Sequence, residues 1–492
     1  MAIAETVAAL VALEDRAPSA LFEKFSGTDI HIWPYLRWPM SQSVAEVEHG
    51  TVPVTVSSSA AQQLRKLASR LVPNRFASRH TPRNSDLLFV VAGRTQADTA
   101  AGRKNWLTDY FAEDYSGRAA VVQYRQLTSL MPTAELPVFS DTYSFHDAEF
   151  REDINARLHP LSDSCIEATR AVIDSLYSEL EFAVSPAGVT VATRKVLRHQ
   201  ARIEGMRKRY DTLLARASPK IVIMDGASYG GSRAIQVRAA KERGIPVAEL
   251  QHGWIGAAHG AYNFGQAMWR DEMRQYLPDT LLTFGDYWAE DISSPFDTVS
   301  IGKPHLEAMV ALAPPLQARP LRVLVTSNPH DRQSASQSTM ALRALLPKTW
   351  KVVFRPHPSE RATVAELYPE LAKADGVEFD LHLDVYQSLR EVRAVLGHSS
   401  TVLFEAISFS CATFVFDSPL ADLAASHPAF GERIVDNSSL AQAVERILLT
   451  STSEAVMHIT ADSKLSAQLV ALSRPRAVEN FREFIDKTLG EH

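Results

Sequence analysis

The chain has 492 residues, of which 46% are hydrophobic and 22% are charged, an ordinary composition for a globular protein. This length exceeds what one hydrophobic core supports and predicts two large domains. The formal net charge of −6 argues against nucleic acid as a partner. Cys165 and Cys411 lie far apart, without metal or redox spacing, so we expect two thiols in a reducing compartment.

Residues 1–5 lack the pattern of a signal peptide, and no apolar run approaches the roughly 18–20 residues of a membrane span. We therefore expect a cytoplasmic protein. Residues 61–84 are basic and carry no acid, with Leu64, Leu67, Leu71 and Phe76 interleaved. This segment predicts either peripheral contact with the anionic inner face of the plasma membrane or a solvated linker. It ends the N-terminal extension expected at 1–84.

The first domain, predicted at 85–302, contains short apolar runs that are typical of strands buried on both faces. The predicted strands are 87–91, 119–122, 221–224, 247–250 and 280–284. The region 163–217 predicts helix with a break near 185–188, and 233–243 predicts a further helix that Gly244 ends.

The second domain, predicted at 303–463, repeats this alternation. Its predicted strands are 321–325, 351–354, 376–380, 393–396 and 412–416. Its predicted helices are 337–346, 361–374, 384–390, 401–409 and 438–449. The remaining segment, 464–492, predicts a helix that bends or restarts at Pro475 and crosses back onto the first domain.

Strands that alternate with helices predict parallel, doubly wound sheets. The predicted fold class is α/β, with two Rossmann-like domains that face each other across a cleft, preceded by an N-terminal helical extension. Ligands of such sheets bind outside the carboxyl ends of the strands. Polar residues follow predicted strands in both domains, at 225–228, 251–254, 327–330, 355–358 and 398–401.

Two of these segments suit an anion. Arg355-Pro356-His357-Pro358 follows one strand, and 397–401 follows another and opens a helix. A helix N-terminus offers unpaired N–H groups and a positive dipole end, which bind phosphate. An arginine and a histidine at the same sheet edge add charge and directional donors. The second domain is therefore predicted to hold a nucleoside monophosphate or diphosphate.

Three motifs carry a family resemblance: Gln251-His252-Gly253, then Arg355-Pro356-His357-Pro358, then Ser399-Ser400-Thr401 with Glu405-Ala406. In this order they are similar to motifs of bacterial transferases that build surface polymers. These are the capsular Kdo transferases, the bacterial polysialyltransferases and the CDP-glycerol glycerophosphotransferases, over about residues 220–420. The resemblance implies a GT-B architecture, in which a His-Pro motif and a Ser-Ser motif hold the donor nucleotide.

One departure narrows this resemblance. The glycerophosphotransferases carry an aromatic residue before His-Gly and Thr-Pro after it, whereas this chain has Gln251 before and Trp254-Ile255 after. The match therefore moves toward glycosyltransferases of capsule and lipopolysaccharide synthesis. It implies transfer of a sugar from a CMP-, CDP- or UDP-linked donor to a glycan or lipid-linked acceptor, without a cofactor. The alternatives are a CDP-dependent glycerophosphotransferase, a nucleotide-sugar epimerase and a non-catalytic nucleotide-sugar-binding scaffold.

The His-Pro motif has a functional and a structural interpretation. His357, beside Pro358, is expected to donate to the donor phosphates and to stabilise the leaving nucleotide, or else to cap the neighbouring helix. Arg355 is expected to contact phosphate, or else to form a structural ion pair.

The helix that opens at the Ser-Ser motif carries the remaining donor-side candidates, His398, Ser399, Ser400, Thr401 and Glu405. We expect one serine to bind phosphate and the other to act as a plain N-cap. The resemblance implies that Glu405 binds a ribose hydroxyl of the donor nucleotide. The alternative is that Glu405 is an ordinary helix acid.

Transfer to a hydroxyl needs a general base. His252 fits because imidazole titrates near neutral pH. Asp225, followed by glycine, is the alternative, because polysialyltransferases use an acid before glycine on the corresponding domain. The residue that is not the base is expected to orient the acceptor. Gln251, Tyr229 and His259 are further candidate acceptor contacts, as is Arg233.

No metal site is expected. The sequence has no paired cysteines, no His-x-x-x-His with a glutamate, and no Asp-x-Asp after a predicted strand. Charge on the leaving group would instead be compensated by Arg355, His357 and helix dipoles.

Overall fold

The computed structural model describes residues 3–48, 81–125, 127, 132–180, 184–430, 433–450 and 463–490. Most of the basic segment 61–84 lies outside these ranges. Among the described residues, no helix is both long and apolar enough to cross a membrane. The chain forms two compact units: unit 1 is Met1–Thr283, Ala289–Ser300 and Val478–His492, and unit 2 is Phe284–Trp288 and Ile301–Ala477.

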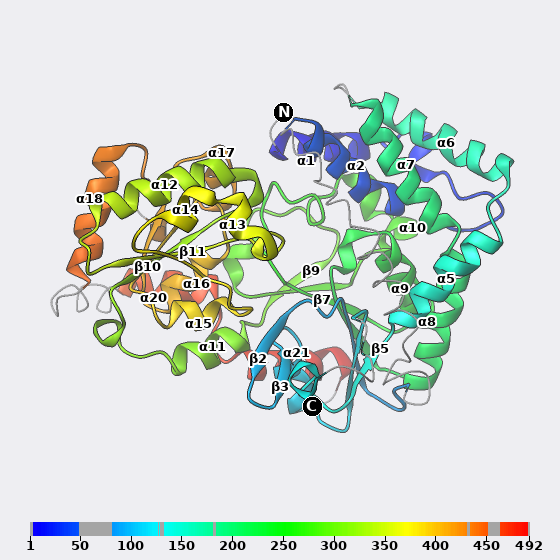
Figure 1. Ribbon diagram of the computed structural model, residues 1–492. Coiled ribbons are helices and arrows are strands. Elements are labelled where there is room, and N and C mark those ends of the chain that lie inside the picture. The colour runs from blue at the N-terminus through cyan, green and yellow to red at the C-terminus, as the bar shows by residue number, and fades with distance from the viewer. Residues whose placement is uncertain are drawn as a thin grey trace. The chain divides into compact units, whose positions relative to one another are not determined.

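Unit 1 is built on a parallel sheet that has seven strands in the described part of the chain (Figure 1). The strands are β1 (Leu87–Val91), β4 (Ala119–Gln123), β5 (Thr142–Ser144), β6 (Ile221–Asp225), β7 (Val247–Leu250), β8 (Thr280–Thr283) and β9 (Asp297–Ser300). Their order is β5-β4-β1-β6-β7-β8-β9. The five predicted strands are confirmed. The edge strands β5 and β9 are short and polar, so no apolar run marks them.

The residues of strand β1 are all apolar, without alternation, because both faces of the sheet are covered at this strand. Leu88 and Val90 pack in one cluster with residues of α8 (Ile203–Ala217) and α9 (Ser232–Lys241). Phe89 faces the other way and stacks on Phe481, whose ring centroid lies 6.1 Å away. Phe481 belongs to α21 (Ala477–Leu489) and also meets Phe111 of α4 (Asp109–Asp114).

The predicted helical region 163–217 divides into α6 (Asp163–Ser178), α7 (Pro186–Gln200) and α8. Ser185 accepts a hydrogen bond from the Gly188 N–H and caps α7, which begins at a proline whose missing N–H costs nothing there. Helix α5 (His146–Leu158) packs on α8. The N-terminal helices α1 (Ile3–Arg16) and α2 (Trp33–Glu48) pack together, and α2 packs along α7.

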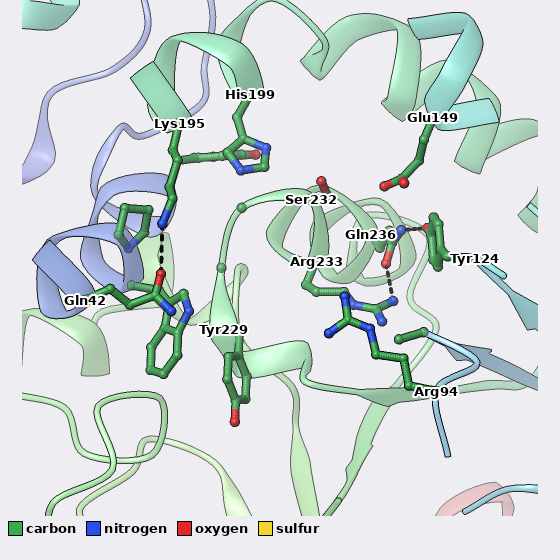
Figure 2. Close-up of a pocket in the computed structure, with 16 residues that line it drawn as sticks. Gln42, Arg94, Tyr124, Glu149, Lys195, His199, Tyr229, Ser232, Arg233 and Gln236 are labelled. Carbon is green, nitrogen blue, oxygen red and sulfur yellow. Dashed lines mark hydrogen bonds between the residues drawn. The ribbon is translucent and has the colours of Figure 1, made fainter. Parts of the chain in front are cut away.

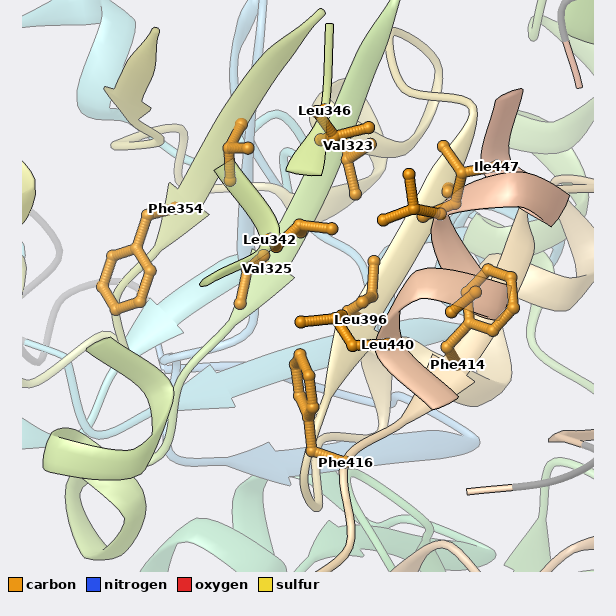
Figure 3. Packing of buried hydrophobic residues seen from close by; sticks show 14 of the residues in the cluster. Val323, Val325, Leu342, Leu346, Phe354, Leu396, Phe414, Phe416, Leu440 and Ile447 are labelled. Atoms are coloured by element: carbon orange, nitrogen blue, oxygen red, sulfur yellow. The ribbon is translucent and has the colours of Figure 1, made fainter. Parts of the chain in front are cut away.

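Unit 2 has a parallel sheet with five strands among the described residues, in the order β12-β11-β10-β13-β14. These are β10 (Arg322–Thr326), β11 (Lys351–Arg355), β12 (Val377–Phe379), β13 (Ala394–Gly397) and β14 (Ala412–Val415), as predicted. Figure 3 shows Val323, Phe354 and Leu396 of the sheet in the cluster with Leu342 and Ile447. Leu342 lies on α12 (Arg332–Leu345) and Ile447 on α18 (Asn437–Leu449).

Two predicted helices of unit 2 differ from the structure. The helix predicted at 337–346 begins at Arg332 in α12. The helix predicted at 361–374 is broken into α13 (Val364–Leu367) and α14 (Pro369–Lys373), because Pro369 can only begin a helix. The predicted restart at Pro475 is confirmed, since α20 (Ser463–Leu472) ends before it and α21 begins after it.

Each sheet has one point at which the strand order reverses. In unit 1 the chain runs outward from β1 to β4 and β5, then returns to β6 and continues on the other side. In unit 2 the corresponding neighbours are β10 and β13. The carboxyl ends at such a switch point leave a crevice where α/β proteins bind ligands. The predicted α/β class with two Rossmann-like sheets, as in GT-B proteins, is confirmed.

Candidate functional site

The switch point of unit 1 is built by a glycine-rich loop between β6 and α9. Gly226, Gly230 and Gly231 all have positive φ, at 63°, 72° and 57°. A Cβ on Gly230 would lie 2.0 Å from the Pro34 carbonyl oxygen of α2, so only glycine fits. The N-terminal helix α2 therefore packs directly on the loop that follows β6.

Asp225, at the end of β6, holds two neighbouring segments together. Its carboxylate accepts a hydrogen bond from the Ala92 N–H, which follows β1, at 2.8 Å. The same carboxylate pairs with Arg233 in the first turn of α9. The Asp225 carboxylate therefore joins the loop after β1 to the first turn of α9.

His252 follows β7 in a cluster of rings. Its ring centroid lies 5.6 Å from that of Tyr229, which in turn lies 4.7 Å from Trp38 of α2. The Tyr229 hydroxyl and His259 Nε2 are 3.1 Å apart, and His259 stacks on Trp38 with centroids 5.8 Å apart. The structure thus brings three predicted acceptor-side residues, His252, Tyr229 and His259, into one cluster.

Burial sets the protonation of both histidines in this cluster. It lowers the pKa of His252, against the opposing effect of the Asp225 carboxylate. It lowers the pKa of His259 to about 3. Both rings are therefore neutral at pH 7, and a neutral imidazole is the form that accepts a proton. Gln251 is buried and its Nε2 donates to the Gly253 carbonyl at 2.9 Å, so it shapes the loop that carries His252.

Glu249, one strand position before Leu250, is a residue that the sequence analysis missed. It is fully buried, accepts from the Ser228 N–H and from the Tyr262 hydroxyl, both at 2.8 Å, and fixes the turn that carries Tyr229. Burial raises its pKa to about 7. The sequence signal for Glu249 was an acid inside the predicted buried strand 247–250. Acidic residues are rarely buried without a partner, so an acid at this place indicates a specific contact.

The switch point of unit 2 gathers the Ser-Ser motif and the loop after β10. Asn328 Nδ2 lies 3.5 Å from Ser399 Oγ, and Ser400 Oγ accepts from the Val402 N–H at 3.3 Å. Thr401 is the N-cap residue of α16 (Val402–Ser408) without a capping bond from its side chain. Ser400 accepts this bond within the turn that precedes the helix, so neither serine is the N-cap residue itself.

His398 lies beneath this loop. It is 3% exposed, its Nε2 lies 3.4 Å from Ser334 Oγ, and its ring packs on Phe416. Its Nδ1 is buried with no hydrogen-bond partner among the described residues. Burial lowers the pKa of His398, against the charge of Asp331. The neutral ring therefore has one buried nitrogen without a hydrogen-bond partner among the described residues.

The His-Pro motif lies on an exposed loop after β11. His357 and Pro358 are exposed, and the Nδ1 of His357 lies 2.7 Å from Ser359 Oγ. The His357 N–H donates to Ser327 Oγ, at the end of β10, at 3.3 Å. This bond ties the His357 loop to the switch point of unit 2, and the Nδ1 contact orients the ring.

Arg355 and Glu405 have strong partners within the protein. Arg355 Nη1 lies 2.5 Å from Asp380 Oδ2, with side-chain exposed fractions of 7% and 1%. Glu405 pairs with Lys303, also in a buried environment. The Arg355 pair is the structural contact that was the alternative to phosphate binding, whereas the pair of Glu405 with Lys303 was not expected. In this structure their charges are compensated inside the protein.

Arg361, shortly after the His-Pro motif, is a cation that the sequence analysis did not select. Its Nε is buried without a hydrogen-bond partner among the described residues. Burial, and then the neighbouring Arg355, lower its pKa. Since Asp380 already pairs with Arg355, Arg361 adds positive charge at this sheet edge. Within the described part of the chain, no group of three His, Cys, Asp or Glu could hold a metal ion.

No protein-family model and no curated protein sequence matches the chain. Solved structures are similar at low identity. A putative UDP-N-acetylglucosamine 2-epimerase from Listeria monocytogenes is 12% identical over 83% of this chain and 98% of its own, with a TM-score of 0.48. UDP-GlcNAc 2-epimerase from Neisseria meningitidis, bound to UDP-GlcNAc, is 12% identical over 82% and 100%, with a TM-score of 0.42. The glycotransferase of kitacinnamycin is 14% identical over 83% and 100%, with a TM-score of 0.43.

Proposed function

We propose that the protein is a glycosyltransferase that moves a sugar from a nucleotide-activated donor to a glycan or lipid-linked acceptor. The observation that carries this proposal is His252, a neutral imidazole at the carboxyl edge of the unit 1 sheet, beside Tyr229. A half-buried, uncharged base suits the activation of a hydroxyl, because it needs no deprotonation at pH 7.

His252 acts as the general base of the proposed reaction. The acceptor oxygen forms a bond to the anomeric carbon while the bond from that carbon to the phosphate oxygen of the donor breaks. The hydroxyl proton passes to the imidazole, and the bonding electron pair leaves with the nucleotide. Asp225, paired with Arg233, positions the loops after β1 and β6 rather than taking the proton.

Unit 2 is proposed to bind the CMP-, CDP- or UDP-linked donor at its switch point. Ser399, the buried ring of His398 and the exposed ring of His357 offer hydrogen bonds to phosphate oxygens. Arg361 supplies positive charge near the leaving group, a role that Arg355 does not fill while it is paired with Asp380. Electrostatic stabilisation of this kind requires no covalent intermediate.

A role in capsule or lipopolysaccharide synthesis, at the cytoplasmic face of the membrane, follows from the motif resemblance and from the basic segment 61–84. Such a segment would draw the protein to the anionic membrane surface, where a lipid-linked acceptor would lie.

Two substitutions test the base. His252→Gln is expected to lower kcat by about 10²–10⁴-fold, the usual contribution of a general base, with donor affinity unchanged. Asp225→Asn is expected to raise the acceptor KM and to lower stability, with a smaller loss of kcat. His159→Gln, an exposed histidine at the end of α5, is the matched control. Donor affinity is measured by calorimetry and transfer by product formation; full activity of His252→Gln would refute the assignment.

A further inference from the structure

A pocket of about 400 Å³ opens at the switch point of unit 1. Its lining comes from the loops after β1, β4 and β6 together with α2, α5, α7 and the first turns of α9 (Figure 2). This volume lies in the range of small-molecule sites. Its position is the crevice where a doubly wound sheet binds ligands.

The pocket is positively charged. Arg94, Lys195 and Arg233 line it, with Glu149 as the acid of the lining. Arg233 is compensated by Asp225, and Glu149 lies 3.9 Å from Arg202. Among the described residues, Arg94 and Lys195 have no ion-pair partner, and Lys195 Nζ donates to the neutral Gln42 at 3.0 Å. Two positive charges therefore remain for a ligand.

The arrangement of these groups suits an anion between them. Figure 2 shows Arg94 and Arg233 on one side of the pocket, Lys195 with Gln42 on the other, and Ser232 between the two sides. Ser232 begins α9, whose N-terminal end adds a positive partial charge. His199 also lines the pocket, and its pKa is lowered to about 4, first by burial and then by the charges of Arg202, Arg198 and Lys195.

Aromatic side chains also line the pocket. Tyr35, Trp38, Tyr124 and Tyr229 contribute to it, and flat ring faces next to fixed polar groups are typical of sites that hold a small polar ligand. Tyr229 also touches the His252 cluster, so the pocket adjoins the proposed base. We infer that this pocket binds a saccharide that carries a carboxylate or a phosphate, as the acceptor end of the proposed transfer. The role of this saccharide as acceptor rests on the proposed function, whereas the selectivity of the pocket for anions does not depend on it.

Calorimetry on the full chain tests the selectivity with a matched pair of probes. Methyl glucuronide and methyl glucoside differ only in the carboxylate, and glucose-6-phosphate presents the phosphate. We expect the glucuronide or the sugar phosphate to bind, and the glucoside to bind at least about tenfold more weakly, since charge-assisted hydrogen bonds are the strong ones. Whichever anionic probe binds more tightly identifies the preferred group.

Arg94→Gln and Lys195→Gln are each expected to weaken the anionic probe by about tenfold and to leave the glucoside unchanged. Arg194→Gln is the control, because Arg194 is exposed on the same helix as Lys195 and does not line the pocket. The inference would be overturned if neither anionic probe binds more tightly than the glucoside, or if the affinity for the preferred anionic probe is unchanged in both pocket variants.

Binding of UDP, CDP and CMP to the same variants separates this inference from the proposed function. Nucleotide binding with no anion selectivity leaves the donor proposal standing and removes the pocket proposal. Anion-selective saccharide binding without any nucleotide binding does the reverse. Competition between a nucleotide and the glucuronide, lost in Lys195→Gln, would show that the pocket holds the nucleotide and would also refute the acceptor assignment.

Discussion

A buried ion pair connects the N-terminal helices to the loop that carries His259. Arg37 of α2 lies 2.6 Å from Glu14 of α1, with side-chain exposed fractions of 7% and 0%. Arg37 also donates to the carbonyls of Gly260 and Asn263, while Glu14 accepts from Trp33 Nε1 at 2.8 Å. The loop after β7 thus depends on residues that lie more than two hundred positions earlier in the chain.

Arg37→Met is expected to lower the free energy of unfolding of unit 1 by about 3–5 kcal/mol, because it leaves the Glu14 carboxylate buried without a cation. The control is Arg243→Met, which removes an ion pair with Asp211 whose side chains are 40% and 35% exposed. Exposed pairs of this kind contribute about 0–1 kcal/mol. The difference between the two variants isolates the effect of burial.

Urea unfolding followed by circular dichroism measures both changes, and the transition of unit 1 is compared between variants. The double variant Glu14→Gln/Arg37→Met is expected to recover part of the loss, because it removes the uncompensated charge. The reasoning fails if Arg37→Met costs no more than Arg243→Met, or if the double variant is less stable than the single one.

Three further predictions concern protonation and metal. Because burial lowers the pKa of His252, the acid limb of kcat/KM is expected below pH 6.5 and should vanish from the residual activity of His252→Gln; a limb above pH 6.5 would contradict this. The pKa of His199 is about 4, against 6.5 when unfolded, so the unfolded state binds its proton first and stability falls as the pH drops from 6.5 towards 4. His199→Gln should remove about 2–3 kcal/mol of that loss, measured by comparing the free energy of unfolding at pH 6.5 and pH 4 in the variant and in the unsubstituted protein. A chelator is expected to leave transfer intact, and activity that is lost and then restored by Mg²⁺ would refute metal independence.

Most of the sheet architecture could be predicted because buried parallel strands leave continuous apolar runs, as at 87–91 and 351–354. The edge strands β5 and β9 were not predicted, because they are short and polar and carry no continuous apolar run. The early start of α12 escaped for a related reason, since its first turn is polar.

The placement of some candidate residues could be predicted. Because β6 and β7 are neighbours in the sheet, His252, Asp225 and Tyr229 could be expected at one sheet edge from the sequence. The partners of individual side chains could not be predicted. Arg355 meets Asp380 and Glu405 meets Lys303 only after the intervening stretches of chain have folded. The pocket lined by Arg94 and Lys195 was missed for the same reason, since these residues come from segments about a hundred residues apart that carry no motif.

The most direct test of the account is the mass of the products formed from a nucleotide sugar and a saccharide acceptor. The account predicts that the acceptor gains the mass of one sugar and that free nucleotide appears in equal amount, only when both substrates are present. A donor that changes its stereochemistry without a change in mass, or a donor that is bound but never consumed, would contradict sugar transfer.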